Sequence, residues 1–449
     1  MRSNQTAQPD DARIPATFLQ AGAPRFWLAV LGIGIGAGVS AIILTRLLEI
    51  VQHLVWAGSG THILKAAEGA GTWRHIIVLL GAGAVVGLGQ LVLVRLSSGN
   101  GIDITSAIWF SAGRLPVVRT LGSAALSVVV VGMGASLGRE GAPKQAGAVV
   151  ADLISDKARL SDEQRRLLVA CGAGAGMAAA YGVPLGGALF ALEVLRGMLA
   201  LRLVLPALLA SLVATAISWL VLPDGPTYQI PAFANSAGAL AWALLIGPVA
   251  GLVAVGYVRT IAWADRNKPS GWRRLAAPIF ALGLLGLISV KFPQVLGNGR
   301  DLSEVLFMGG ITSSALLLLL LILKPVATVI CLGSGTPGGL FTPSLTFGAL
   351  LGGMLGYAGS QLGSAVPLGL SAVLGAGALL AATTQGPISS VVLMMELTGR
   401  DRSFIAPLLL AVITATLVSR MIEPRSIYDA RLSDEEVKAR LAAREPSPK

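Results

Sequence analysis

Hydrophobic residues in this chain gather into apolar stretches that recur from near its start to near its end. A helix needs about 20 predominantly apolar residues to cross a bilayer. Some stretches approach that length, and others are shorter or interrupted by Gly and Pro, as in the broken helices of transporters. The pattern predicts an all-α, polytopic integral membrane protein. The stretches are Trp27 to Leu44, Ile76 to Val94, Leu121 to Leu137, Leu199 to Leu222, Leu240 to Val258, Leu275 to Val290, Ala315 to Leu332, Leu368 to Ala382 and Ile405 to Val418.

The composition indicates that lipid surrounds most of the chain. Of the 449 residues, 54% are hydrophobic, 13% are charged and 56 are Gly, whereas soluble domains average about 25% charged residues and about 7% Gly. Residues 1–24 contain no apolar signal-peptide core. We therefore expect the first apolar helix to direct the chain to the bilayer.

Short sequence patterns repeat in the same order in the two halves of the chain, at offsets of 198 to 203 residues. Such collinear repeats are typical of transporter folds built from two homologous halves, in which interrupted helices point their ends at an ion near mid-membrane. The repeated pairs are Gly99–Asp103 with Gly297–Asp301, Gly172–Ala175 with Gly375–Ala378, Pro184 with Pro387, and Glu193 with Glu396.

The repeats predict five segments along the chain. A polar N-terminal segment covers residues 1–24, and the first membrane repeat covers residues 25–222. A Pro-rich linker at residues 223–235 leads into the second membrane repeat at residues 236–424. Residues 425–449 are expected to form a C-terminal helix and a charged tail.

One acidic residue stands almost alone in a Gly-rich part of the sequence. Glu140 lies within Gly138 to Pro143, and between Ser97 and Val150 the only other acidic residue is Asp103. An ionisable group inside the membrane is costly and by default marks an ion pathway or a proton relay. Glu140 therefore predicts a protein that handles ions.

The Gly-rich loops predict the sign of that ion. Four such loops begin at Gly99, Gly138, Gly297 and Gly335, each before an expected helix. The first N–H groups of a helix have no partner within it and carry the positive end of the helix dipole, so they stabilise anions. The carbonyl filters and acidic rings of cation channels are not visible. The loops favour an anion over a cation.

Several other classes of protein are disfavoured. The net charge of +11 lies in tails and loops without a basic stripe, which indicates attraction to anionic lipid and no nucleic-acid partner. No Ser-His or paired-Asp arrangement lies in the apolar segments, so a protease, or any other enzyme, is not expected. A membrane scaffold would not need the repeated Gly-rich helix starts. Neither Cys171 and Cys331 nor the three histidines have metal-ligand spacing, so no metal or other cofactor is expected.

Three motifs carry a resemblance to a known family. The segments Gly138 to Gly141, Gly338 to Pro343 and Arg425 to Tyr428 are similar, in this order, to motifs of the CLC family of chloride channels and proton-coupled chloride exchangers. The resemblance covers about Trp27 to Leu432 and is greatest to the bacterial ClcB-like, voltage-gated branch, which shares the run Ala381 to Thr384. It implies a fold of two inverted repeats with tilted and broken helices. It also implies a multi-pass homodimer in the bacterial inner membrane that binds chloride ions.

The resemblance implies roles for individual residues. Glu140 matches the gating glutamate, whose carboxylate occupies an anion position until it is protonated or displaced. Leu340 and Phe341 match positions whose backbone amides contact the central anion, and Tyr428 matches a tyrosine whose hydroxyl donates to it.

The remaining anion-binding residues come from the first two motifs. Arg139 and Gly141 flank the gate, and Asn100 and Gly101 belong to the motif that usually reads Gly-Ser-Gly-Ile-Pro in the family. Asn100 replaces the serine that donates to the anion, and its amide NH₂ could still donate a hydrogen bond.

One position separates the possible transport modes. Exchangers of the family typically carry an inner glutamate directly after the position of Glu193, and here that position is Val194. Valine cannot carry a proton, so passive chloride conduction through a channel is favoured, with proton-coupled antiport as the alternative. A fluoride exporter is less favoured because fluoride-specific members tend to lose the residue at Tyr428. Glu193 and Glu396 are expected to be structural, hydrogen bonding at helix ends.

Overall fold

The computed structural model describes residues 14–15, 20, 22–56, 62–96, 103–233, 236–399 and 404–444. Within these ranges the regular structure is helical, and β-type pairing is limited to one bridge between Gly138 and Gly339. The predicted all-α class is therefore confirmed. Asn100 and Gly101 lie outside the described residues.

The helices of the first half begin with one long helix and end with another. They are α1 (Ala23–Trp56), α2 (Ile63–Glu68), α3 (Thr72–Leu96), α4 (Ile104–Phe110), α5 (Val117–Gly132), α6 (Gly141–Lys157), α7 (Asp162–Tyr181), α8 (Pro184–Leu189), the π-helix η2 (Phe190–Arg196) and α9 (Leu201–Ser218).

The second half contains a similar series of helices, and a short C-terminal part follows it. Its helices are α10 (Ala237–Arg266), α11 (Arg273–Lys291), the 3₁₀ turn η3 (Pro293–Val295), α12 (Arg300–Phe307), α13 (Ser314–Gly333), α14 (Phe341–Gln361), α15 (Leu368–Thr384), α16 (Pro387–Thr398), α17 (Ile405–Ile422), the 3₁₀ turn η4 (Asp429–Arg431) and α18 (Asp434–Arg444).

Seven helices within the described residues are long and apolar enough to cross a membrane: α1, α3, α9, α10, α11, α13 and α17. Each exposes large apolar side chains to the surroundings, among them Leu54, Trp73, Leu201 and Phe280. Apolar side chains facing outward from a buried bundle are suited to lipid contact. The chain is therefore a multi-pass membrane protein.

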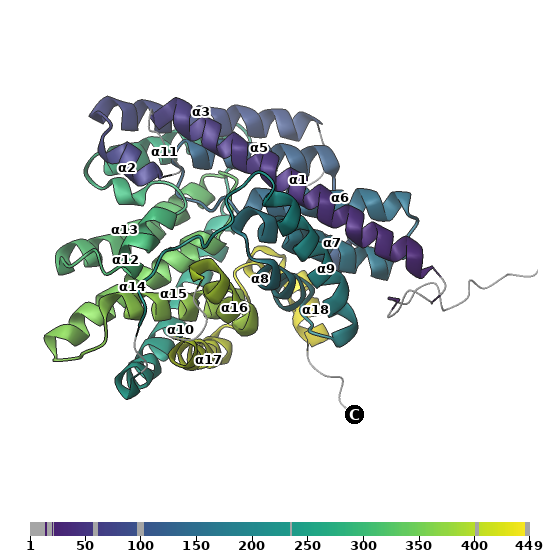
Figure 1. Cartoon of the computed structure of the whole chain (residues 1–449). Helices are drawn as coiled ribbons and strands as arrows, with labels where there is room; N and C mark the ends of the chain where they lie inside the picture. Colours follow the sequence, from purple (N-terminus) through teal and green to yellow (C-terminus); the bar gives the residue numbers. More distant parts are fainter. Residues whose placement is uncertain are drawn as a thin grey trace, which may run out of the picture.

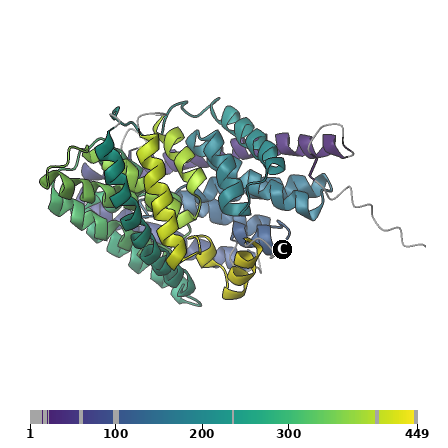
Figure 2. The same ribbon diagram turned by 90° about the horizontal axis from the view of Figure 1, so that it is seen from below.

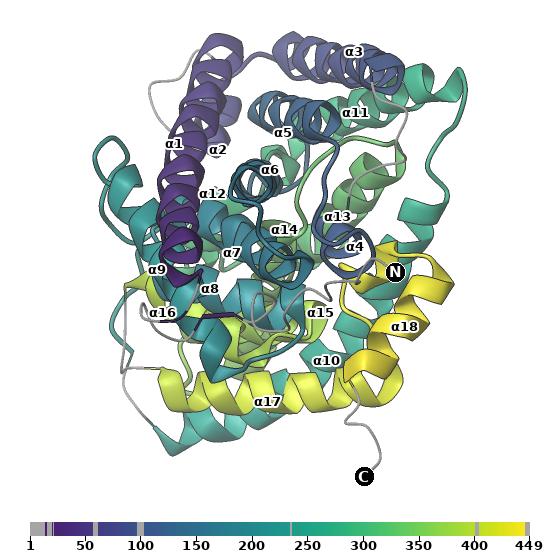
Figure 3. The same ribbon diagram turned by 90° about the vertical axis from the view of Figure 1, so that its right-hand side faces the viewer.

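The Gly- and Ala-rich helices lie inside this apolar shell. Figure 3 shows α6, α7 and α14 toward the middle of the molecule, with α1, α3, α10 and α17 around them. Figure 1 shows that elements of the two halves, such as α3 and α11, lie side by side. The yellow C-terminal helix in Figure 2 folds back against the body of the protein, where α18 contacts α4.

Glycine permits the close approach of the interior helices. A Cβ atom on Gly147 of α6 would overlap the carbonyl of Gly172 on α7. In the second repeat, a Cβ atom on Gly348 of α14 would overlap the carbonyl of Gly375 on α15. Small residues that let backbones touch are a general device for packing helices in membranes. The same contact therefore recurs in both repeats, which accounts for part of the high glycine content.

Two glutamates tie the repeats together reciprocally. Each lies near the end of a helix in one repeat and accepts hydrogen bonds from the first N–H groups of the equivalent helix in the other, which have no partner within that helix. This geometry confirms the structural role expected for Glu193 and Glu396. The bonds run to Glu193 from Ile388 N (3.1 Å) and Ser389 N (2.6 Å), and to Glu396 from Leu185 N (2.9 Å) and Gly186 N (2.7 Å).

Candidate functional site

Glu140 is fully buried at the start of α6, with its side chain directed at the start of α14. The backbone N–H of Phe341 donates to Oε1 at 2.7 Å. The hydroxyl of Thr342 donates to Oε2 at 3.0 Å, and the hydroxyl of Tyr181 lies 3.4 Å from the same oxygen. The carboxylate thus occupies the positive end of the α14 dipole, where an inorganic anion would also be stabilised.

The backbone around the carboxylate is fixed by the bridge between the two loops. Gly138 and Gly339 exchange two hydrogen bonds of 2.7 Å each. A Cβ atom at either glycine would overlap the carboxylate of Glu140. These glycines therefore leave room for an acidic side chain between the two helix starts.

Tyr181 and Thr342 belong to the site although the sequence did not single them out. Tyr181 is the last residue of α7, and its hydroxyl lies 3.0 Å from that of Thr342. A buried tyrosine at the end of an Ala- and Gly-rich helix was an available signal, as was the hydroxyl residue that follows Phe341. Neither signal identified the Glu140 carboxylate as the partner of these two hydroxyl groups.

The aromatic side chains form a continuous path from the Glu140 region to Tyr428. The ring of Phe190 packs edge to face against Phe341, with centroids 6.4 Å apart. It packs in the same way against Tyr428 at 5.8 Å. Phe190 therefore lies between the predicted amide site and the predicted hydroxyl site.

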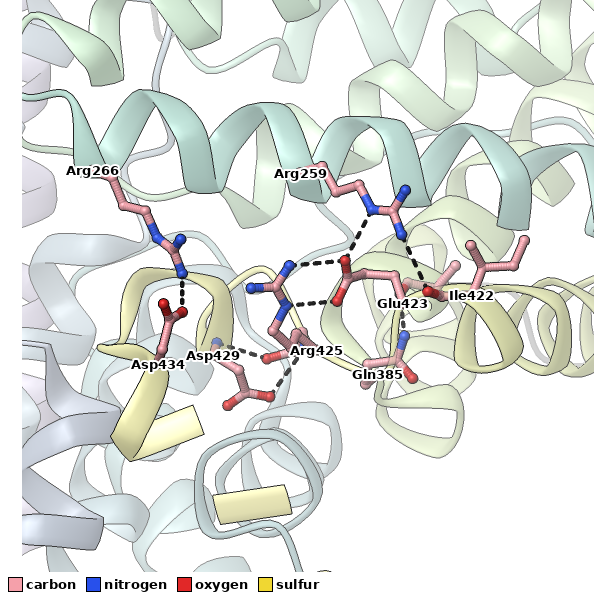
Figure 4. A network of polar contacts seen from close by, with 10 residues as sticks. Arg259, Arg266, Gln385, Ile422, Glu423, Arg425, Asp429 and Asp434 are labelled. Carbon is pink, nitrogen blue, oxygen red and sulfur yellow. Dashed lines mark hydrogen bonds and ion pairs between the residues drawn. The ribbon is translucent and has the colours of Figure 1, made fainter. Parts of the chain in front are cut away.

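A polar network positions the segment that carries Tyr428 (Figure 4). Glu423 accepts from Arg425 at 2.6 Å and from Arg259 at 3.1 Å. The hydrogen bond from Arg425 is the main cause that holds the pKa of Glu423 below its usual range. One residue before Tyr428, the N–H of Ile427 donates to the carbonyl of Thr383 at 2.7 Å. The segment is thus anchored to both α10 and α15.

A cavity of about 420 Å³ opens beside these residues. Gly141, Leu340 and Tyr428 line it, together with the loop from Ser334 to Gly339 and with Lys144. The structure therefore brings together Gly141, Leu340 and Tyr428, which the sequence places far apart. Glu140 directly precedes Gly141 at the start of α6, and Phe341 directly follows Leu340 at the start of α14.

Arg139 lies apart from this cavity. Its guanidinium group is 4.9 Å from the centroid of the Tyr181 ring, and it lines a separate, small cavity with Asn298 and Arg300. Asp103, whose replacement of a proline is compatible with a helix start, caps α4 by accepting from Thr105 N at 2.7 Å.

Val194 is buried in the π-helix η2. Its carbonyl accepts a hydrogen bond of 2.6 Å from Arg440 of the C-terminal helix. Arg440 also forms an ion pair of 2.6 Å with Asp429, and both side chains are buried. The guanidinium group of Arg440 therefore lies against the backbone of Val194, the residue at which the family resemblance implies an inner glutamate in typical exchangers.

The fold and the site define a class of protein. Two membrane repeats whose broken helices direct their N-termini at a buried, protonatable carboxylate are the architecture of a membrane anion transporter. The chain belongs to the CLC family, since the family model described as voltage gated chloride channel matches residues 82–420.

Individual relatives agree with this membership. A putative chloride channel protein, ClcB-like, of Ralstonia nicotianae is 32% identical, over 90% of this chain and 96% of the relative. The H(+)/Cl(-) exchange transporter ClcA of Vibrio campbellii is 29% identical, over 92% of this chain and 91% of the relative. A slow cyanobacterial Cl-/H+ antiporter has the same fold, with a TM-score of 0.78 and 22% identity, covering 93% of this chain and 98% of that one.

Proposed function

We propose that this anion transporter exchanges chloride for protons, with Glu140 as the group that both blocks the anion and carries the proton. The observation that carries the proposal is the hydrogen bond from Phe341 N–H to the buried Glu140 carboxylate. While it is ionised, Glu140 fills the place that chloride needs. Protonation removes its charge and turns one oxygen into a donor, so the carboxyl group loses its advantage at a positive helix end.

Chloride entry and proton binding are therefore coupled at one residue. Chloride stabilised by the amides of Leu340 and Phe341, and by the hydroxyl of Tyr428, competes with the ionised side chain. A proton on Glu140 favours the anion, and release of the proton favours the side chain. Exchange follows when the proton reaches and leaves Glu140 on opposite sides of the membrane.

The similar proteins favour exchange over passive conduction. The Vibrio campbellii relative and the cyanobacterial structure carry names of proton-coupled chloride exchangers. Chloride is favoured over fluoride because Tyr428 is retained and lines the cavity. We also expect the homodimer that the family resemblance implies, which light scattering of the purified protein tests.

A chloride channel is the second candidate. The Ralstonia nicotianae relative is named as a chloride channel protein. Val194 and the adjacent guanidinium group of Arg440 leave no carboxylate at the usual inner proton-transfer position. In the exchange mechanism, water in the 420 Å³ cavity would carry the proton instead.

Flux measurements in liposomes separate these functions. The purified chain is reconstituted with equal chloride on both sides and an imposed pH gradient, and chloride and proton movements are recorded together. Exchange predicts that the pH gradient alone drives chloride uphill. A channel predicts no net chloride movement under these conditions, because equal chloride gives it no driving force. A second measurement with an imposed chloride gradient should then show chloride flux without proton movement if the chain is a channel, and absence of chloride movement in both measurements would contradict both functions.

A further inference from the structure

A buried lysine lies next to Glu140 in the first turn of α6. Lys144 is only 4% exposed, and its backbone N–H donates to the carbonyl of Glu140 at 3.3 Å. Residues four apart lie on the same face of a helix. The side chain of Lys144 therefore lies on the same face of α6 as Glu140, and this face packs against Phe190 and Tyr428.

The ammonium group of Lys144 faces aromatic rings and one hydroxyl. Its Nζ is 3.4 Å from the hydroxyl of Tyr428 and 4.9 Å from the centroid of that ring. It lies 5.1 Å from the centroid of Phe190. Among the described residues, no carboxylate oxygen lies within 4.0 Å of this nitrogen. An ammonium group has three donors, so one weak hydroxyl contact leaves most of its capacity unused.

Two more deeply buried cations in the described part of the chain have stronger partners. Arg440 forms its ion pair with Asp429 at 2.6 Å. Lys324 donates to three backbone carbonyls at 2.8 to 3.2 Å. A buried charge is tolerated only when it is paired and hydrogen bonded. Lys144, with one hydroxyl contact at 3.4 Å, therefore has donor capacity for a further acceptor.

The space for that partner is present. Lys144 lines the 420 Å³ cavity, which exceeds the roughly 30 Å³ share of one water molecule many times over. The cavity is lined by five basic and two acidic residues, and Asp265, one of the two, is already paired with Lys268 and Arg431. A concave surface with an excess of positive charge concentrates anions. The basic residues are Arg119, Lys144, Lys268, Arg274 and Arg431.

We propose that Lys144 is an anion-binding residue, whose ammonium group and the Tyr428 hydroxyl together hold a monovalent inorganic anion in this cavity. This inference rests on the proposed anion transport and adds a fully charged ligand to it. Backbone amides alone bind anions without a full charge, whereas an ammonium group holds them more tightly. Lys144 therefore sets the affinity for chloride on the Tyr428 side of the gate.

Chloride binding to the purified full-length protein tests the role of Lys144. Isothermal titration in detergent compares the wild type with Lys144→Met, which keeps the side-chain length and removes the charge. Loss of a charge-assisted hydrogen bond is expected to raise the Kd for chloride about tenfold or more. Lys157→Met is the matched control, because it removes the same charge from the exposed end of the same helix. Its Kd should stay within about twofold of the wild-type value.

A second measurement distinguishes a ligand from a packing residue. A bound anion raises the melting temperature by an amount that depends on its concentration relative to Kd. For Lys144→Met, and for Lys144→Gln if the first variant does not fold, the chloride-dependent rise should require higher chloride. A melting temperature that is lower at every chloride concentration, with an unchanged chloride-dependent rise, would overturn the proposal. So would wild-type chloride affinity in the Met variant.

Binding in detergent does not depend on proton coupling. If the liposome measurements show chloride movement without protons, exchange fails while the Lys144 proposal stands. If Lys144→Met binds chloride as the wild type does, the Lys144 proposal fails while exchange stands.

Discussion

The carboxylate of Glu140 accepts a hydrogen bond of 2.7 Å from the backbone N–H of Phe341, 201 residues further along the chain. This bond joins the start of α6 in the first repeat to the start of α14 in the second. An anion that reaches the same N–H must displace the carboxylate. The charge on Glu140 and the occupancy of the α14 helix start are therefore linked, and the predictions below follow from this link and from the contacts around it.

Replacing Glu140 by Gln should abolish proton movement and leave chloride movement. The amide cannot ionise, so it neither carries a proton nor competes as an anion at the helix end. Chloride flux in liposomes should then vary little between about pH 4 and pH 8, where carboxyl and imidazole groups titrate. Proton movement that persists in Glu140→Gln would show that Glu140 does not carry the transported proton.

Gly339→Ala should push the gate open. A Cβ atom at this position would overlap the carboxylate of Glu140, so the side chain must leave the Phe341 amide. We expect faster chloride flux with weaker dependence on pH than in the wild type. Gly256→Ala is the control, because its added Cβ atom would have no heavy atom within 4 Å. Equal chloride flux in both variants would show that the close contact with Gly339 does not determine the position of the Glu140 side chain.

Glu396→Ala and Glu193→Ala should destabilise the protein by similar amounts. Each removes the acceptor for two helix-start N–H groups in the opposite repeat. Loss of a helix cap costs about 1 kcal/mol, which should lower the melting temperature in detergent. Glu435→Ala, which changes an exposed side chain of α18, should leave the melting temperature unchanged. A melting temperature that drops in only one of the two cap variants would contradict the equivalence of the repeats.

The anchor of the Tyr428 segment should weaken in acid. Arg425 holds the pKa of Glu423 below its ordinary value of 4.5. A carboxyl whose pKa is lower in the folded state contributes stability above the unfolded pKa, and that contribution is lost as the pH falls through the folded pKa. Wild type should therefore be more stable than Glu423→Gln at pH 7. The difference should shrink as the pH falls below 4.5, which melting curves at a series of pH values measure.

Local sequence features were sufficient to predict the helical membrane class and the repeats. The apolar stretches, the collinear patterns and the Gly-rich loops are all short-range signals, and helix formation depends on neighbouring residues. The same reasoning predicted helices after the Gly-rich loops at Gly138 and Gly335, where α6 and α14 begin, whereas Leu340 and Phe341 were singled out by the family resemblance. It also predicted that Glu193 and Glu396 bond to helix ends.

Long-range packing determined the contacts that the sequence did not reveal. Lys144 was visible as a charge four residues after Glu140, but its meeting with Tyr428 depends on how the C-terminal segment folds back. Arg440 next to Val194 depends on the docking of α18 in the same way. Asn100 and Gly101 stay predictions of the sequence, as do their roles in anion binding.

The sequence by itself determined that this protein crosses the membrane in two related halves and carries a glutamate, Glu140, at one of its Gly-rich helix starts. The tertiary structure decided that this group bonds to the N–H of Phe341 and that Lys144 lies between Phe190 and Tyr428. The physical reason is that the first set of features depends on residues adjacent in the chain. The second depends on many weak contacts between helices, such as those of Gly147 with Gly172, whose sum fixes how distant segments meet.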